Sequence, residues 1–113
     1  MLNVKYRLKK RKQFNYIYKH GKSTGCDILT LVYTFSRLKD IKVGFSVSKK
    51  VGNSVKRHLA VRKMREAVRP LVDKMRENHS YIFIAKESIL EKSVADIQKS
   101  CENVLRKAGL LNV

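Results

Sequence analysis

Acidic residues are scarce in this chain of 113 residues, which has nine Asp and Glu against 26 Lys and Arg and a formal net charge of +17. An excess of this size indicates a polyanionic partner, with nucleic acid first and an anionic membrane surface second. The hydrophobic content of 43% is too high for a disordered basic tail. Because the length suits one hydrophobic core, we expect a single folded domain over residues 1–113.

Long apolar segments are also missing. No run approaches the ~20 residues that span a bilayer, and no apolar segment follows the early charges as it does in a secretory signal. The two cysteines, Cys26 and Cys101, have no metal-ligand spacing and no neighbouring histidines. We therefore expect a soluble cytoplasmic protein with two free thiols and no membrane partner.

Paired catalytic groups are absent as well. The nine acids are scattered, and His20, His58 and His79 have no partner at a useful sequence spacing, although distant residues can still meet in space. Cleavage by the polypeptide would need a positioned acid and base or clustered carboxylates for metals. No glycine-rich phosphate loop is present. The sequence predicts a binding protein without catalytic residues, and it gives no information on a metal site.

The first half of the chain predicts one helix followed by strands. The spacing of Phe14, Ile17 and Tyr18 predicts a helix over residues 11–20 that Gly21 stops. Residues 28–36 and 42–48 are typical of strands, and we expect these two to pair in antiparallel fashion across a polar turn at residues 37–40. A further short strand is expected near residues 22–27.

The second half predicts helix, strand and helix. Asn53 is the expected N-cap of a helix from Ser54, which Pro70 ends or kinks before a last turn. The predicted buried face of this helix consists of Ala60, Val61, Met64, Ala67, Val68 and Leu71. The stretch "SYIFIA" predicts an interior strand, and a final helix follows Ser93 with an apolar stripe that contains Cys101. The order α-β-β-α-β-α indicates a two-layer α/β (α+β) sandwich.

A basic ridge lies beside the apolar face of the middle helix. Residues 49–65 hold seven Lys and Arg and no acid, and the ridge itself is formed by His58, Arg62, Arg65 and Arg69. Basic helices are often only solvated faces. Here, however, "KKVGN" places two lysines before a glycine turn that opens the helix, where backbone N–H groups add an anion site. This combination favours phosphate-backbone binding, whereas a membrane role is weaker because the apolar face is needed to cover strands.

The run "SVSKKVGNSVKR", followed by "RKMREA", resembles the signature region of the protein subunit of bacterial ribonuclease P, and "LKKRKQFNYIYKHGKS" resembles the start of that family. The resemblance implies a left-handed β-α-β crossover, where the usual rule predicts a right-handed one. It also implies that a large RNA subunit with Mg²⁺ carries the catalysis. The implied partners are ribonuclease P RNA and precursor tRNA, with no obligate protein partner.

The resemblance assigns two sets of residues. Those expected to bind the RNA subunit are Lys49, Lys50, Asn53, Lys56, Arg57, His58, Arg62, Arg65 and Arg69. Those expected to bind the 5′ leader of precursor tRNA are Phe14, Tyr18, Tyr33, Ser46, Ser48 and Lys49. Aromatic side chains beside lysines suit stacking on unpaired bases. The alternative for Phe14 is ordinary core packing.

The chain departs from the family pattern at three positions. The family's Arg-Asn-Arg and following Lys-Arg pair correspond here to Arg57-His58-Leu59 and Val61-Arg62. Docking of this edge on the RNA subunit is therefore expected to be weaker or differently arranged. Two other functions remain open from the residues alone: a structural or ribosome-associated RNA-binding protein of similar fold, and a metal-dependent nuclease.

Overall fold

The computed structural model describes residues 4–36 and 40–112. The helices are α1 (Arg11–His20), α2 (Ser54–Val68) and α3 (Val94–Lys107), and the strands are β1 (Lys22–Gly25), β2 (Leu29–Phe35), β3 (Ile41–Val47) and β4 (His79–Ala85). Short 3-10 helices are η1 (Val4–Tyr6), η2 (Lys49–Val51), η3 (Arg69–Lys74) and η4 (Glu87–Glu91). The predicted α+β class is confirmed, and β1 is the additional short strand. Residues 37–39 of the predicted turn lie outside the described residues.

The predicted pairing of β2 with β3 is wrong. The strand order is β1-β2-β4-β3, so β4 lies between them. It pairs antiparallel with β2 and parallel with β3. The physical reason is that β4 is the continuously apolar strand, with Tyr81, Ile82 and Phe83 all fully buried, and such a strand requires a neighbour on each edge. The "SYIFIA" segment is thus the interior strand, as expected.

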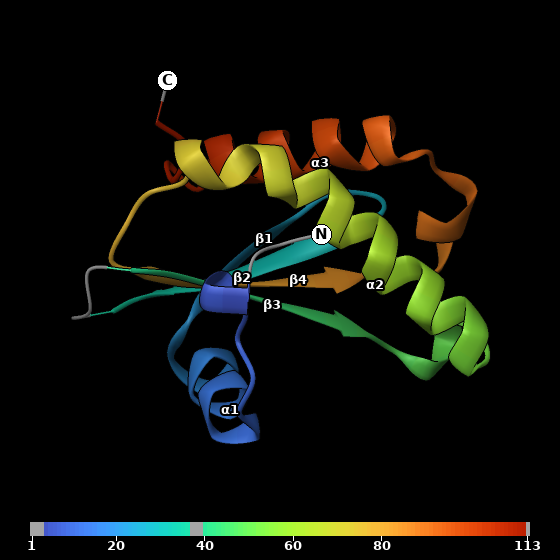
Figure 1. The fold of residues 1–113 in the computed structure, drawn as a ribbon, viewed down its shortest axis with the longest axis horizontal. Coiled ribbons are helices and arrows are strands. Elements are labelled where there is room, and N and C mark those ends of the chain that lie inside the picture. Colours follow the sequence, from blue (N-terminus) through green and yellow to red (C-terminus); the bar gives the residue numbers. More distant parts are fainter. Residues whose placement is uncertain (1–3, 37–39, 113) are drawn as a thin grey trace.

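The parallel strands β3 and β4 are joined through α2. In Figure 1, α2 lies above the sheet, the parallel strands β3 and β4 both run to the right, and β3 is nearer to the viewer. If the molecule is turned so that α2 is in front and these strands point up, β4 lies to the left of β3. The crossover is therefore left-handed, as the family resemblance implied, against the usual right-handed rule.

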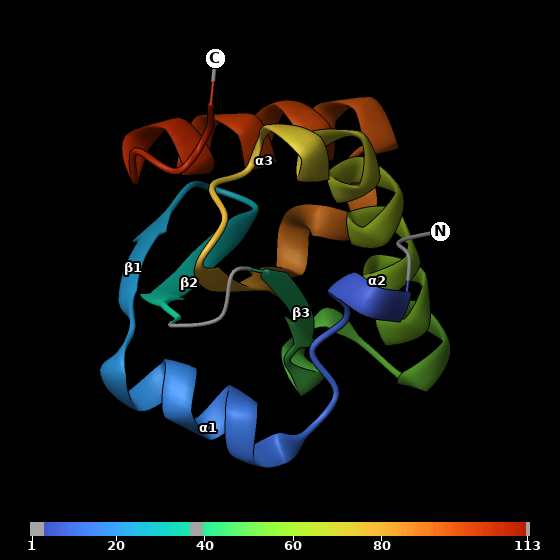
Figure 2. The same cartoon turned by 60° about the vertical axis from the view of Figure 1, so that its left-hand side comes forward.

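The helices lie on both faces of the sheet. Helices α2 and α3 cover one face, and α1 lies beneath the other (Figure 1). Figure 2 shows α1 extending from the side of β3 to the side of β1. Between α1 and the sheet lies a small cluster of buried side chains from Leu8, Ile17, Val32 and Ile82, separate from the main core. The predicted sandwich therefore gains a partial third layer.

Helix α2 has the predicted cap and phase. The Oδ1 atom of Asn53 accepts a hydrogen bond from the backbone N–H of Lys56 at 3.0 Å. The buried side chains are Ala60, Met64, Ala67 and Val68. Val61 is only half-buried, at the margin of this face. The helix ends at Val68, and Pro70 lies in the first turn of η3, which supplies the buried Leu71.

Helix α3 covers the same face of the sheet. The Oγ atom of Ser93 accepts the backbone N–H of Asp96 at 3.1 Å, which confirms the cap. Cys101 is fully buried and Cys26 is half-buried, and both thiols are free. Within the described residues, no helix combines the length and apolarity needed to cross a membrane.

Candidate nucleic-acid interface

The turn between β3 and α2 exposes lysines on a fixed backbone. Val51 of η2 is buried, whereas Ser48, Lys49 and Lys50 are exposed. Gly52 has a φ of 146°, a conformation that favours glycine, and its N–H donates to the carbonyl of Lys49 at 3.2 Å. The buried valine and the glycine turn together direct both lysine side chains to the surface at the start of α2.

The start of α2 is electropositive for two reasons. Its first turn contains no acidic residue, and the N-terminal end of a helix carries a partial positive charge. Lys56, His58 and Arg62 are exposed along the same helix. A shallow hollow of about 290 Å³ is lined by Val47, Ser54, Arg57, His58 and Val61. We refer to the exposed or half-exposed cations of this segment as the basic surface: Lys49, Lys50, Lys56, Arg57, Arg62, Lys63, Arg65 and Arg69.

Two arginines of the basic surface are partly buried. The Nε atoms of Arg57 and Arg65 are inaccessible to solvent and have no hydrogen-bond partner. Burial, followed by the positive charge of nearby Arg7, lowers the pKa of Arg65. Arg69 lies 3.8 Å from the carboxylate of Glu66, and both side chains are well exposed. An anion bound near Arg65 would offset both its desolvation and its repulsion from Arg7.

Four of the predicted leader-binding residues share the sheet face that α1 crosses. The rings of Phe14 and Tyr18 lie 6.4 Å apart on one side of α1, and Tyr18 is 43% exposed. Phe14 is half-buried because its ring packs over Gly44 of β3. Alternation along β3 places Ser46 and Ser48 on the same face as Gly44. We call these four residues the α1–β3 surface, and Lys49 follows it directly.

Tyr33 does not join this group. It packs against the main core on the α2 and α3 side, whereas its neighbour Val32 belongs to the small cluster between α1 and the sheet. Because successive side chains of a strand point to opposite faces, Tyr33 lies across the sheet from Phe14 and Tyr18. The structure therefore places four of the six predicted leader residues on one face of the sheet, with Lys49 next in the chain after Ser48, and it leaves Tyr33 on the opposite face.

Sequence reasoning did not identify Arg7 or Tyr16. Arg7 is distant from α2 in sequence, and no local pattern indicates its approach to Arg65. Tyr16 packs on His20 with ring centroids 4.5 Å apart, and the i, i+4 spacing of these two residues was the available signal.

Elsewhere, the Nδ1 atom of His79 lies 2.9 Å from the carbonyl oxygen of Glu77. Over residues 4–36 and 40–112, no three His, Cys, Asp or Glu side chains are grouped to hold a metal ion.

Known proteins match almost the whole chain. The family model described as Ribonuclease P matches residues 2–109. The ribonuclease P protein components of Clostridium kluyveri and Clostridium botulinum are 39% and 37% identical, over 93% and 94% of this chain and 96% of each relative.

Solved structures agree with this match. The Staphylococcus aureus RNase P protein is 31% identical and superimposes with a TM-score of 0.84, over 95% of this chain and 98% of that one. A mutant of that protein, described as defective in mRNA degradation activity, gives a TM-score of 0.85 at 30% identity, over 95% of this chain and 91% of that one. The Thermotoga maritima RNase P protein shares the fold, with a TM-score of 0.80 at 21% identity, over 89% of this chain and 96% of that one. This chain belongs to the ribonuclease P protein family.

Proposed function

We propose that this chain is the protein subunit of bacterial ribonuclease P, an endoribonuclease that matures the 5′ end of tRNA. In this proposal the basic surface binds the catalytic RNA subunit, and the α1–β3 surface binds the 5′ leader of precursor tRNA. The observation that carries the proposal is the group of exposed lysines around the acid-free N-terminus of α2, which directly follows β3, the strand over which the ring of Phe14 packs at Gly44.

Phosphate binding by the basic surface has a direct physical basis. Lys49, Lys50 and Lys56 place exposed ammonium groups around the positive end of α2. Each phosphate that such a group neutralises releases condensed counterions, which favours binding at low salt. Arg57 and Arg65 offer planar guanidinium groups, which suit bidentate contacts with phosphate. Asn53 acts indirectly, because its cap holds the first turn of the helix in place.

Leader binding by the α1–β3 surface combines stacking with polar contacts. An exposed ring such as that of Tyr18 can stack on any unpaired base, which makes the contact tolerant of sequence. The hydroxyls of Ser46 and Ser48 can donate to phosphate or ribose oxygens. Lys49 is the first residue of the basic surface and directly follows Ser48 of the α1–β3 surface in the chain, so this cation can serve either RNA.

Catalysis is assigned in this proposal to the RNA subunit and Mg²⁺. The described residues contain no cluster of acidic or histidine ligands for a metal, so we place Mg²⁺ with RNA phosphates rather than with this polypeptide. The chain's own contribution is to position and neutralise the two RNAs. Such a role belongs in the cytoplasm, where tRNA precursors are processed.

Sequencing the RNA that co-purifies with the protein tests the proposal. Ribonuclease P RNA is expected. Ribosomal RNA would support a structural RNA-binding role, and the absence of any RNA would favour an independent nuclease. In reconstitution, purified protein alone should leave precursor tRNA intact, whereas the protein with the RNA subunit and Mg²⁺ should mature its 5′ end. Cleavage by rigorously RNA-free protein would overturn the assignment.

A further inference from the structure

The segment before α1 runs along the outer edge of β3. This strand is the last of the sheet, and Arg7 lies opposite Val43 in a parallel bridge on its free edge. The backbone N–H of Leu8 donates to the carbonyl oxygen of Val43 at 2.9 Å. Leu8 belongs to the small cluster between α1 and the sheet, whereas Val43 belongs to the main core on the α2 and α3 side. Because paired residues share a face, Arg7 lies on the α2 side of the sheet.

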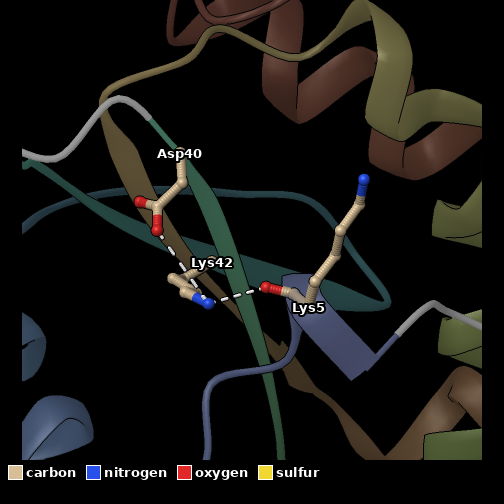
Figure 3. Close-up of polar contacts among 3 residues, drawn as sticks. All are labelled: Lys5, Asp40 and Lys42. Atoms are coloured by element: carbon tan, nitrogen blue, oxygen red, sulfur yellow. Dashed lines mark hydrogen bonds and ion pairs between the residues drawn. The ribbon is translucent and has the colours of Figure 1, made fainter.

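A side chain of β3 fixes the start of this segment. The ammonium of Lys42 donates to the carbonyl oxygen of Lys5 in η1 at 2.6 Å, and it lies 3.9 Å from the carboxylate of Asp40 (Figure 3). Tyr6, also in η1, packs against the main core. The chain therefore has a polar tie and an apolar anchor directly before Arg7, which hold the backbone of this arginine in place.

Arg65 lies on the flank of α2 that faces this edge. On the other flank, Lys63 donates to the carbonyl oxygens of Leu90 and Lys92, at 3.2 and 3.0 Å, just before α3. At about 100° per residue, Arg65 lies roughly 200° from Lys63 around the helix. Its flank is therefore turned away from α3 and toward the outer edge of β3, above which α2 lies (Figure 1). Burial, followed by the positive charge of Arg7, lowers the pKa of Arg65, which agrees with this placement.

Two neighbouring guanidinium groups at this place suit a single phosphate. The Nε atom of Arg65 is enclosed by protein without a hydrogen-bond partner, so contacts with a ligand fall to its terminal nitrogens. Like charges that the fold holds near each other repel, and partial burial raises that cost. An anion between Arg7 and Arg65 would replace the repulsion by two attractions. Phosphate fits best, because planar guanidinium groups form bidentate hydrogen bonds with its oxygens.

We propose that Arg7 and Arg65 form a two-arginine clamp for one backbone phosphate of the catalytic RNA subunit, and that Lys42 is a positioning residue for this clamp. Lys42 acts through the backbone, because its ammonium holds the carbonyl oxygen of Lys5. The inference rests on the proposed function, since it takes the RNA subunit as the partner. It adds a binding residue from the segment before α1, outside the basic surface.

The test measures the affinity of the full-length protein for the RNA subunit in Mg²⁺. Arg7→Ala and Arg65→Ala should each weaken binding about tenfold or more, the scale of a lost charge-assisted hydrogen bond. The double variant should bind about as weakly as either single variant, because both arginines hold the same phosphate. Arg7→Lys keeps the charge without the planar fork, so it should recover only part of the affinity. Lys99→Ala removes an exposed cation on α3 and is the matched control, with little expected change.

Lys42→Met tests the positioning role. Methionine keeps an unbranched side chain but cannot donate to the carbonyl oxygen of Lys5. Affinity for the RNA subunit should therefore fall in the wild-type background and should not fall further in the Arg7→Ala background. Lys42→Arg retains a donor and should keep most of the affinity, and thermal melting checks that each variant is folded. An equal loss in both backgrounds would show that Lys42 acts independently of Arg7, against the positioning role.

The remaining outcomes separate the clamp from the proposed function. Losses that multiply in the double variant would place Arg7 and Arg65 on separate phosphates and overturn the clamp. A loss confined to precursor tRNA bound by the reconstituted holoenzyme, with unchanged affinity for the RNA subunit, would overturn it too. If Lys49→Ala weakened binding of the RNA subunit and Arg7→Ala did not, the clamp would fail and the proposed function would stand. No loss with either variant would count against both.

Discussion

The ring of Phe14 in α1 occupies the space that a side chain at Gly44 of β3 would fill. A Cβ atom at position 44 would lie 2.6 Å from Cζ of Phe14 and 2.7 Å from its Cε1, well inside van der Waals contact. The glycine thus allows α1 to approach the sheet closely. Phe14 therefore anchors the helix that also presents Tyr18, and a change in its packing is expected to disturb the α1–β3 surface.

Gly44→Ala should destabilise the fold. The added methyl group must displace the half-buried ring of Phe14, and overpacking of this kind costs about 1–3 kcal/mol. Thermal or denaturant unfolding measures the loss. Ser46→Ala, two residues along the same strand, is the matched control and should change stability little. Combining Gly44→Ala with Phe14→Leu should recover part of the loss, and a strictly additive double mutant would contradict the contact.

Tyr18→Ala should weaken binding of precursor tRNA by about 1–3 kcal/mol if the ring stacks on a leader base. The effect should vanish with leaderless tRNA, and Tyr18→Phe should retain affinity. Phe14→Ala should lower both the affinity for precursor tRNA and the stability of the fold, because its half-buried ring also packs against the sheet. Equal losses for tRNA with and without a leader would argue against a leader site on this surface.

Lys49→Ala and Arg65→Ala should each make binding of the RNA subunit less sensitive to salt. Loss of one phosphate contact lowers the magnitude of the log–log slope by roughly 0.7–0.9. The measurement is a series of binding isotherms over increasing salt concentration. Arg65→Lys keeps the charge and should preserve most of the slope. If the slope did not change for either alanine variant, the RNA subunit would be bound elsewhere on the protein.

The two cysteines should differ in reactivity. Burial raises the pKa of the Cys101 thiol, so it stays protonated at neutral and mildly alkaline pH, and the thiolate is the reactive form. Iodoacetamide should therefore label half-buried Cys26 first in the native protein. Both should react in denaturant, as mass spectrometry can show. Rapid native labelling of Cys101 would contradict its burial.

The local elements were predictable because their patterns are local. The period of α2 identified Ala60 and Met64 as buried, and the Asn53 cap follows from the residue type alone. Strand pairing was not predictable in this way, since the central position of β4 depends on contacts between distant segments. The face of Tyr33 was ambiguous for a related reason: Leu31 and Val32 are both buried, so alternation along β2 does not distinguish the two faces.

The site was predictable only in part. Exposed cations at the start of α2 could be placed from the glycine turn and the cap. The crossing of α1 over the sheet could not, and it determines that Ser46 and Ser48 share a face with Phe14.

Leu59→Arg is the sharpest test of the basic surface. Leu59 is 43% exposed, and the sequence resemblance implies an arginine at this position, so the substitution adds a cation without opening a cavity. If this surface docks on the RNA subunit, binding should tighten and the salt slope should steepen by roughly 0.7–0.9, the value for one phosphate contact. Val61→Lys is the paired comparison: Val61 is half-buried, so its added charge should come with lower stability, moderated by extension of the lysine stem toward solvent. Unaltered affinity for Leu59→Arg would mean that this part of α2 does not contact the RNA subunit. A large loss of stability at Leu59 would instead contradict its exposed position on the helix.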